Sequence, residues 1–363
     1  MKRTGWKTGV AIVATVWLMA CRQSSPVSVV ESPSATSSSV ATTASPPAAS
    51  PTPPHAYPLP TPTQRGSVFG ACRLPVEVPG DDDRPLGWLD VPAGTYTPDP
   101  AGAAAVIQER KSSVQVVGDL TWDPAVGKWL PALPRWISRD GTRYVSGNLE
   151  VVDAATGRIV HRISTTPFPN EVVAYIGSAI YMQAIGKDPP PGLWKLDTAS
   201  WRLTKISSAD ANWELVDTQS AWGVYGFTVR RLDLSTGKVT DLYRGDPNSD
   251  WSVSLLGFVG SGVLVVTTYQ GIYGIQVHAM VVLHADGSTA PIDVPPDLQD
   301  ATLDGVQDGA AFIFTVTYPL SPGQPSAYPL GYGLAAWDPD RGLQFVMTKA
   351  PEGYSIAGPC MAV

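Results

Sequence analysis

The sequence predicts an all-β protein, a β-propeller of six blades that follows a cleaved export signal and a disordered tether. Three observations predict it. A strand–turn–strand pattern with an Asp and a Gly recurs through residues 67–363. Pro and Gly, 35 and 34 of the 363 residues, interrupt the chain too often for long helices. The segment before residue 67 has the composition of a signal and a spacer, which cannot form a packed core.

The first 20 residues have the zones of an export signal. Lys2, Arg3 and Lys7 form a positively charged start, and residues 10–20 (VAIVATVWLMA) form an apolar stretch without charge. These 11 apolar residues are fewer than the roughly 20 that a membrane-spanning helix needs. They have the length of the apolar zone of a signal peptide, so we expect residues 1–20 to be removed.

The residues before Cys21 distinguish lipid attachment from ordinary secretion. Leu18-Met-Ala-Cys21 resembles the lipobox of bacterial lipoproteins. The resemblance implies cleavage before Cys21, a diacylglycerol on its sulfur, and usually a further acyl chain such as palmitate on its new amine. One acyl chain binds a membrane marginally, whereas two or more anchor a protein stably. We therefore expect membrane lipid as a partner and a location on a cell membrane, facing outside the cytoplasm. A signal peptide that merely ends near a cysteine is the alternative.

Residues 21–66 are predicted to be a disordered tether. Residues 22–66 contain 10 Pro, 10 Ser, 6 Thr and 6 Ala among 45 residues, which cannot bury enough apolar surface to offset the entropy of ordering. At about 3 Å per residue the tether reaches on the order of 100 Å. Removal of residues 1–20 takes three positive charges and changes the net charge from −7 to −10. Because nucleic-acid binding needs basic patches, we expect no nucleic-acid partner.

The globular part, residues 67–363, contains a repeated hairpin. In each copy an apolar strand ends at an Asp, a tight turn leads to a Gly in most copies, and a second strand follows. The Asp carboxylate bonds backbone amides two residues later and Gly adopts positive φ, so the chain folds back on itself. Each interval also holds two further strand-like runs, such as 171–176 and 179–185. Four strands per unit of roughly 40–50 residues are typical of a propeller blade. The hairpin Asp residues are Asp123, Asp153, Asp197, Asp233, Asp286 and Asp338.

Six hairpins predict six blades. The stretch Gly87-Trp-Leu-Asp90-Val-Pro-Ala-Gly94 has the same Asp-to-Gly spacing, which leaves seven blades open. We assign it to the first blade as that blade's first turn. The hairpins resemble those of WD40-type and TolB-like propellers. Ser138-Arg-Asp-Gly141 resembles a TolB-like turn, with Arg139 where Pro is usual. The resemblance supports the fold without choosing a subfamily. A pair of β-sandwiches is the rival fold.

Cys72 and Cys360 lie near the two ends of the globular part. Outside the cytoplasm such an even pair predicts a disulfide, with two buried free thiols as the alternative. The segments 72–78 and 354–360 around them are strand-like. Propellers commonly complete the last blade with a strand from the other terminus, so we expect the disulfide to close the ring.

Few residues suggest catalysis or the binding of a metal or cofactor. Nucleophile-elbow, zinc-protease and P-loop motifs are missing from the sequence, and we assign no catalytic residue, metal ligand or cofactor. His278 and His284 on one strand, and the acidic runs 81–83 and 246–250, resemble parts of metal sites. Packed or surface side chains are the better interpretation of both.

Twelve Trp residues have two interpretations. Those near hairpin Asp residues predict packing between blades, because aromatic rings bury large areas. Others are candidates for a carbohydrate- or peptide-binding mouth. The first group is Trp122, Trp194 and Trp337, and the second is Trp213, Trp222 and Trp251.

Two functions remain. The first is a monomeric binding or scaffold module on the cell surface that recognises an envelope protein or a glycan through loops on rigid blades. The alternative is a hydrolase or lyase with its site in the central channel, because propellers host both. Two or three carboxylates or His at one channel mouth favour the enzyme, whereas an aromatic or weakly polar channel favours binding.

The lipobox resemblance makes a direct prediction. Cys21→Ala removes the sulfur that carries the lipid, so the protein should move from the membrane fraction to a soluble or uncleaved form. Fractionation with mass spectrometry, with and without globomycin, measures this. Unchanged fractionation and no mass shift after globomycin would contradict lipid attachment.

Overall fold

The computed structural model of the chain describes residues 66–78, 86–105, 120–164, 169–184, 191–245, 251–271, 274–298, 301–319, 330–350 and 354–363. They lie within one compact unit, Tyr57–Val363. Residues 1–20, Cys21 and the predicted tether up to residue 65 lie outside the described residues, as do the acidic runs 81–83 and 246–250. In the described ranges no helix is long and apolar enough to span a membrane.

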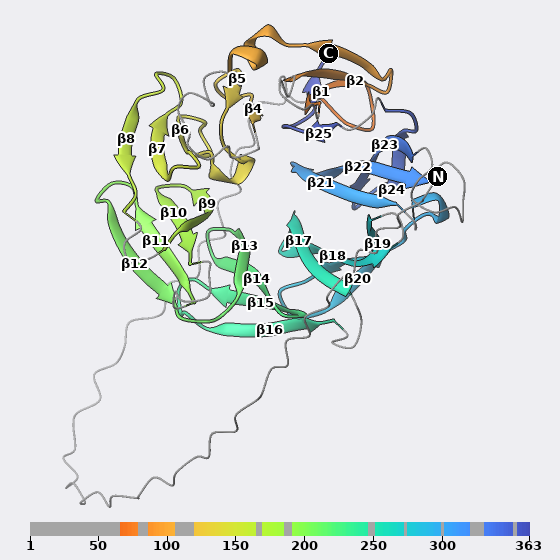
Figure 1. The fold of residues 1–363 in the computed structure, drawn as a ribbon. Helices are drawn as coiled ribbons and strands as arrows, with labels where there is room; N and C mark the ends of the chain where they lie inside the picture. Colours follow the sequence, from red (N-terminus) through yellow and green to blue (C-terminus); the bar gives the residue numbers. More distant parts are fainter. Residues whose placement is uncertain are drawn as a thin grey trace, which may run out of the picture. The chain divides into compact units, whose positions relative to one another are not determined.

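Antiparallel sheets follow one another in chain order around a ring (Figure 1). Blade 1 contains β1 (Cys72–Glu77), β2 (Leu86–Val91), β3 (Thr95–Pro98), β25 (Ser355–Ile356) and β26 (Met361–Ala362). A separate hairpin contains β4 (Thr121–Asp123) and β5 (Lys128–Leu130). Blade 2 contains β6 (Arg143–Val145), β7 (Glu150–Asp153) and β8 (Ile159–Arg162).

Each of the remaining sheets has four strands, with the first near the centre of the ring in Figure 1. Blade 3 contains β9 (Glu171–Ile176), β10 (Ala179–Gln183), β11 (Leu193–Asp197) and β12 (Arg202–Ser207). Blade 4 contains β13 (Asn212–Val216), β14 (Ser220–Tyr225), β15 (Thr228–Asp233) and β16 (Val239–Arg244). Blade 5 contains β17 (Trp251–Val259), β18 (Gly262–Gly271), β19 (Gly274–Leu283) and β20 (Thr289–Ile292). Blade 6 contains β21 (Thr302–Asp308), β22 (Ala311–Pro319), β23 (Leu330–Asp338) and β24 (Gly342–Met347). The six-bladed β-propeller is confirmed.

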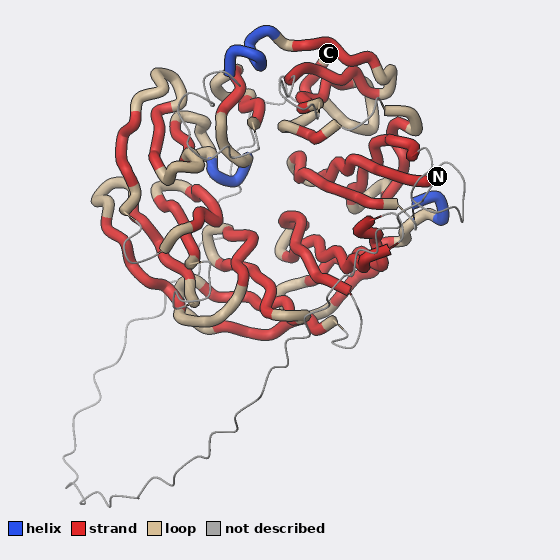
Figure 2. Tube along the Cα trace, in the orientation of Figure 1, coloured by secondary structure: helices blue, strands red, loops and turns tan. Residues whose placement is uncertain are grey.

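Little helix interrupts the strands (Figure 2). Residues 100–105 are helical, and two short 3-10 helices are η2 (Pro134–Trp136) and η3 (Pro296–Leu298). The helix at 100–105 was not predicted. It begins after Asp99, whose side chain accepts a hydrogen bond from the amide of Ala101 at 2.9 Å, as an N-terminal cap does.

The repeated turns form as their chemistry predicts. In all six hairpins the Asp carboxylate accepts a hydrogen bond from an amide two or three residues later, as from Thr156 to Asp153 at 2.8 Å. The Gly that ends the turn has positive φ, for example +71° at Gly237. In the copy without Gly, Trp201 takes this conformation with φ +55°, and its ring stacks on His161 with centroids 3.9 Å apart.

The Asp90 turn differs from its predicted place. It joins β2 to β3, the outer pair of blade 1, whereas Asp123 joins β4 to β5 in a separate two-stranded sheet. The assignment of Asp90 to the first turn of a blade that also holds Asp123 is therefore wrong. The physical reason is that β1 pairs with strands from the C-terminus, and these occupy the position nearest the centre in blade 1.

The two ends of the globular part meet in blade 1, as predicted. β1 pairs with β2 on one side and with β25 and β26 on the other. A disulfide joins Cys72 to Cys360, whose Cα atoms are 5.8 Å apart, within the usual range for such a bond. The amide of Gly66 donates a hydrogen bond to the carbonyl of Cys360 at 2.9 Å. The expected disulfide and the expected meeting of the termini are confirmed.

The core lies between neighbouring blades and is therefore spread around the ring. A blade with neighbours on both faces buries both faces of its middle strands, so these strands read as continuous apolar runs. Every residue of β10 is buried, for example. Trp213 and Trp222 are each only 1% exposed and belong to this core, which assigns them to packing and not to a binding mouth.

The disulfide should supply much of the stability of the ring. Cys72→Ser removes a crosslink between residues 288 positions apart. The chain-entropy model assigns about 5–6 kcal/mol of stabilisation to a crosslink over a loop of this length. We expect the melting temperature to fall on the order of 10 °C and aggregation to rise, because the strand edges of blade 1 become available. Calorimetry measures the first effect and light scattering the second.

The double variant Cys72→Ser/Cys360→Ser is the matched control. It should melt like either single variant, because each single change already removes the whole bond. Free alkylation of both cysteines in the native, unreduced protein would contradict the disulfide.

Candidate functional site

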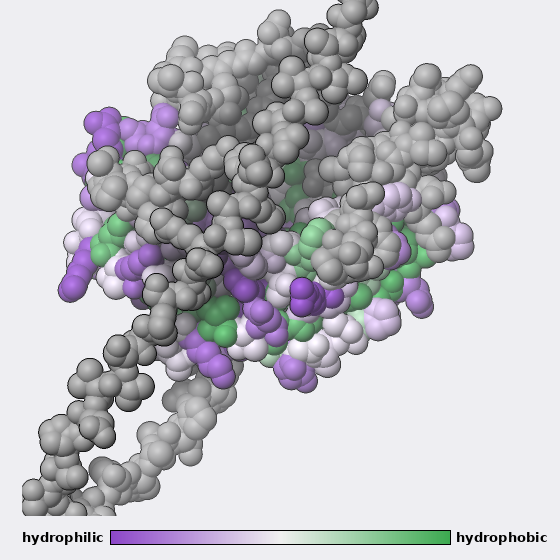
Figure 3. Space-filling view, turned by 60° about the horizontal axis from the view of Figure 1, so that its bottom comes forward, coloured by the Kyte–Doolittle hydropathy of each residue, from purple (hydrophilic) through white to green (hydrophobic). Residues whose placement is uncertain are grey.

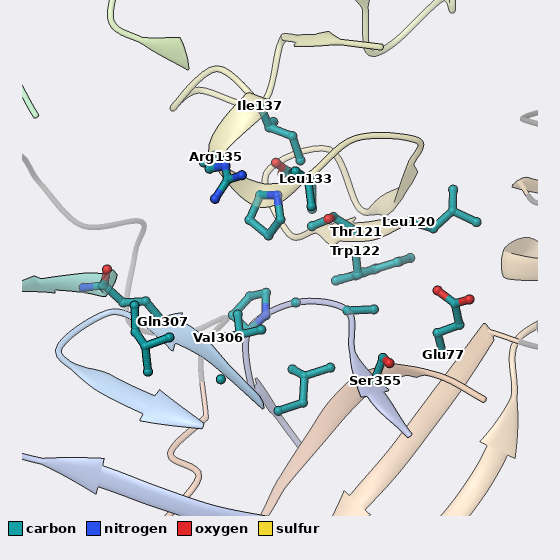
Figure 4. A pocket seen from close by; sticks show the side chains of 18 of the residues that line it. Glu77, Leu120, Thr121, Trp122, Leu133, Arg135, Ile137, Val306, Gln307 and Ser355 are labelled. Carbon is teal, nitrogen blue, oxygen red and sulfur yellow. The ribbon is translucent and has the colours of Figure 1, made fainter. Parts of the chain in front are cut away.

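A cavity of about 720 Å³ lies where the inner strands of blades 1, 4, 5 and 6 and the hairpin β4–β5 converge (Figure 4). Its volume is within the range of ligand pockets in proteins. Much of its wall is apolar and comes from several blades. The apolar side chains include Leu120, Trp122, Leu133, Leu256, Val306 and Ile356.

Arg135 is the cationic side chain of this wall. It lies in η2, and in Figure 4 its guanidinium points into the cavity. The next residue, Trp136, is buried and donates a hydrogen bond from its indole to the carbonyl of Val172 at 2.9 Å. This bond holds η2 against blade 3 and leaves Arg135 exposed. Within the described part of the chain Arg135 makes no hydrogen bond and no ion pair.

Two carboxylates lie near Arg135 on the inner strands of blades 3 and 4. Burial raises the pKa of Glu171 above its usual value, while a hydrogen bond from Gln183 and the charge of Arg135 act in the opposite direction. Burial also raises the pKa of Glu214, opposed by a hydrogen bond from the amide of Leu255 and by Arg135. The charge of Glu171 adds to the rise at Glu214. The three side chains therefore form one electrostatic group, which we call the Arg135 group.

Both carboxylates are also held by hydrogen bonds. Glu171 accepts one from Gln183 at 2.9 Å. Glu214 accepts one from the amide of Leu255 at 2.9 Å and one from Asn212 at 3.1 Å. Leu255 itself lines the cavity, whereas Glu171 and Glu214 are not among the residues of its wall.

Buried or half-buried polar side chains join successive blades. Gln183 of blade 3 accepts a hydrogen bond from the amide of Trp213 in blade 4 at 2.7 Å. Glu214 of blade 4 bonds Leu255 of blade 5. Gln307 of blade 6 accepts from the amide of Phe258 at 3.0 Å and donates to its carbonyl at 2.7 Å. We call these contacts, together with the Trp136 bond to Val172, the inter-blade hydrogen bonds.

The Arg135 group and the inter-blade hydrogen bonds were not predicted from the sequence. A signal was present at Gln183, a polar residue that ends the otherwise apolar run Ala-Ile-Tyr-Met. A buried amide needs partners, so such a residue marks a specific contact. Nothing in the local sequence marks Arg135 or Glu214 in this way.

Two of the residues singled out from the sequence, Trp122 and Asp123, line the cavity. Trp122 also packs edge-on against Trp88 of blade 1, with ring centroids 4.8 Å apart. His278 is exposed on β19, whereas His284 lies beyond the end of that strand, in the turn before Gly287. Among the described residues no group of three His, Cys, Asp or Glu side chains is placed to hold a metal ion.

Three Trp residues remain of those for which the sequence suggested packing between blades or a binding mouth. Trp194 and Trp337, 8% and 4% exposed, are buried as the packing prediction expects. Trp337 contacts the ring of Phe312, with centroids 5.7 Å apart. The side chain of Trp251 lies outside the described residues.

Comparison with known proteins bears on the fold alone. The chain matches no protein-family model and no curated protein. Among solved structures it is similar to TolB from Acinetobacter baumannii, with 12% identity over 77% of this chain and 54% of that one, and a TM-score of 0.33. It is also similar to a puromycin-hydrolysing peptidase of Mycobacterium tuberculosis, with 13% identity over 78% of this chain and 46% of that one, and a TM-score of 0.39. The chain thus spans about half the length of each of these proteins. No function for this chain follows from likenesses at this level.

The raised pKa of Glu214 predicts a pH dependence of stability. Above the ordinary value of 4.5, the unfolded chain loses the proton of Glu214 before the folded chain does. The unfolded state then binds fewer protons, so the free energy of unfolding falls as the pH rises through the interval up to the raised pKa. Glu214→Gln does not titrate, so its stability should fall less over this interval. Urea unfolding from pH 4 to pH 8 measures both proteins.

The exposed Asp210 provides the control. Asp210→Asn should leave the pH dependence of the unfolding free energy as it is in the wild type. Identical pH profiles for the wild type and Glu214→Gln would contradict the raised pKa.

Proposed function

We propose that the protein is an exported, lipid-anchored binding module whose β-propeller captures a ligand in the central cavity. The observation that carries the proposal is Arg135, an exposed guanidinium that points into a preformed cavity with a largely apolar wall. A site of this kind binds through apolar contact and gains orientation from a few polar groups. A guanidinium has five N–H donors in a fixed geometry, and those of Arg135 are open to a ligand.

The N-terminal part supports the placement of this module. With residues 1–20 removed, lipid on Cys21 anchors the chain, and residues 21–66 hold the domain of 67–363 away from the membrane. The ligand is then a molecule of the cell envelope, an envelope protein or a glycan, and the chain acts as a monomer. The disulfide between Cys72 and Cys360 supports an oxidising location outside the cytoplasm.

The described outer surface offers a weaker site than the cavity does. The large hydrophobic side chains exposed there are Ile159, Tyr225 and Val363, which belong to separate segments. Figure 3 shows hydrophobic and hydrophilic residues interspersed on the described part of one face. Scattered apolar side chains are normal on a protein surface, whereas a contiguous patch marks an interface.

One observation favours the alternative, a hydrolase or lyase. Glu171 and Glu214 both have raised pKa values and lie near Arg135, and carboxylates with raised pKa can act as general acids. However, both oxygens of Glu214 already accept hydrogen bonds from protein groups. Binding therefore remains the better interpretation.

The experiment compares two charge reversals in cells. Arg135→Glu replaces the cation of the cavity, whereas the matched control Arg202→Glu replaces an exposed arginine on β12, the outer strand of blade 3. The protein is crosslinked on intact host cells, and captured envelope components are identified by mass spectrometry. We expect the wild type and Arg202→Glu to capture the same component and Arg135→Glu to lose it. Arg135→Glu should melt somewhat lower, because it places a third carboxylate near Glu171 and Glu214, and circular dichroism at the assay temperature should show that all three proteins are folded.

Equal capture by all three proteins would place the binding surface elsewhere and contradict the proposal. Chemical conversion of the captured component by the wild type, abolished by Glu171→Gln, would favour the enzyme instead.

A further inference from the structure

We infer that the ligand of the central cavity is the N-terminal end of a peptide chain, bound through its protonated amine and its first carbonyl oxygens. The inference rests on the proposed function and narrows the ligand to one chemical class. It comes from the positions of the charged and hydroxyl side chains in the cavity wall, and from the apolar surface between them.

Among the described residues, the charged side chains of the cavity wall are those of Glu77, Asp123 and Arg135. Asp123 is engaged in its own hairpin turn, where one carboxylate oxygen accepts hydrogen bonds from the amides of Ala125 at 2.7 Å and Val126 at 3.4 Å. A ligand in the cavity therefore meets Glu77 as the acidic group and Arg135 as the basic group.

Glu77 is a buried carboxylate at the end of β1, only 5% exposed. Its partner across the sheet is Ser355 of β25, and side chains opposite each other in an antiparallel pair lie on the same face. Both residues line the cavity, and in Figure 4 the carboxylate of Glu77 points toward Trp122. Glu77 also has contacts within the protein, but a carboxylate has about four acceptor sites. A carboxylate, a hydroxyl and an aromatic ring thus lie on one side of the cavity.

These three groups suit an ammonium ion. An ammonium has three N–H donors and no acceptor, so it can donate to the carboxylate of Glu77 and to the hydroxyl oxygen of Ser355. The face of an indole ring attracts a cation, and Trp122 supplies such a ring. A buried charge costs free energy unless it is paired, and the attraction between opposite charges is stronger in a buried site than in water. A cationic ligand group is therefore favoured beside Glu77.

Arg135 suits the groups that follow the amine in a peptide. In Figure 4 Arg135 and Glu77 lie on opposite sides of Trp122, so an amine at Glu77 is kept away from the guanidinium. The guanidinium has five N–H donors and no acceptor, and within the described residues it makes no hydrogen bond or ion pair. A peptide offers it a carbonyl oxygen at every residue, spaced at about 3.3–3.6 Å when extended.

The wall between the two charges suits apolar side chains of a peptide. Leu133, Val306 and Ile356 belong to this wall. The cavity volume of about 720 Å³ holds a chain end of a few residues. A neutral glycan could donate hydroxyls to Glu77 but would bring no cation to it. The wall therefore favours a peptide over a neutral glycan.

The experiment measures the binding of tetrapeptides of Ala, Leu and Val to the full mature chain by titration calorimetry. Each peptide has an amidated C-terminus and either a free or an acetylated amine, so that the charge of the amine is the variable. We expect the free-amine peptides to bind about tenfold more tightly than the acetylated ones, a factor that one favourable charge contact can produce.

The pH provides a second measurement on the wild type. A peptide α-amine loses its proton near pH 8. The affinity of the free-amine peptides should therefore fall between about pH 7 and pH 9.5, while that of the acetylated peptides should stay the same. Both measurements use the wild type, so they do not depend on whether any variant folds.

Variants assign the two ends of the ligand. Glu77→Gln keeps the shape of the side chain and removes its charge, so free-amine and acetylated peptides should bind alike. Arg135→Gln should weaken both about tenfold, because both carry the carbonyl oxygens. The matched control is Glu150→Gln, at a residue that pairs with Arg162 on blade 2 and is not part of the cavity wall. It should leave both affinities unchanged. Circular dichroism shows whether each variant is folded.

Equal affinities of the wild type for free-amine and acetylated peptides, or a preference that persists in folded Glu77→Gln, would overturn the inference. If no tetrapeptide binds while Arg135-dependent capture on intact cells persists, the ligand class is wrong and the proposed function stands. If neither experiment depends on Arg135, both fail.

Discussion

The ring depends on hydrogen bonds that a side chain of one blade makes with the backbone of a neighbouring blade. A blade cannot bury its faces alone, so its stability comes from its neighbours. Apolar contact between flat sheets is not directional and would let one blade slide on another. Gln183, Glu214 and Gln307 fix the register, because each binds a particular backbone amide in a neighbouring blade. A slide of one residue would leave a buried donor without a partner, which costs about 1–3 kcal/mol at each site.

These bonds also explain why the centre of the ring can hold a cavity. The inner strands are held in place by their contacts with the neighbouring blades. Their side chains therefore do not need to pack against one another across the centre of the ring. The same hydrogen bonds hold the blades together and place side chains near the cavity. The carbonyl of Val172 and the amide of Leu255 each take part in such a bond. Trp136 binds the first and so positions Arg135, and Glu214 binds the second beside the same space. Arg135 and Glu214 are thus placed by the hydrogen bonds that hold the blades together.

The hairpins and the meeting of the termini were predictable from the sequence because their causes are local or covalent. An Asp followed by Gly forms its turn through local contacts, and one isolated pair of cysteines offers only one possible disulfide within the globular part. The Arg135 group was not predictable, because its contacts join distant segments. Gln183 meets Asn212 29 residues later, and Gln307 meets Phe258 49 residues earlier. The helix at 100–105 was visible in principle, since Asp99-Pro100 before an Ala-rich stretch is a typical helix start.

The position of the disulfide has a mechanical consequence. A pull on the chain before Gly66 reaches Cys72 after six residues, and there the bond to Cys360 passes the force to the C-terminal segment. β1 cannot then peel away from β25 and β26, because β1 and the C-terminal segment that contains those strands are loaded together. Peeling breaks backbone bonds one after another, whereas strands that are loaded together must break many at once. A force applied to the chain before Gly66 therefore acts on a covalent link and not on the edge of the sheet.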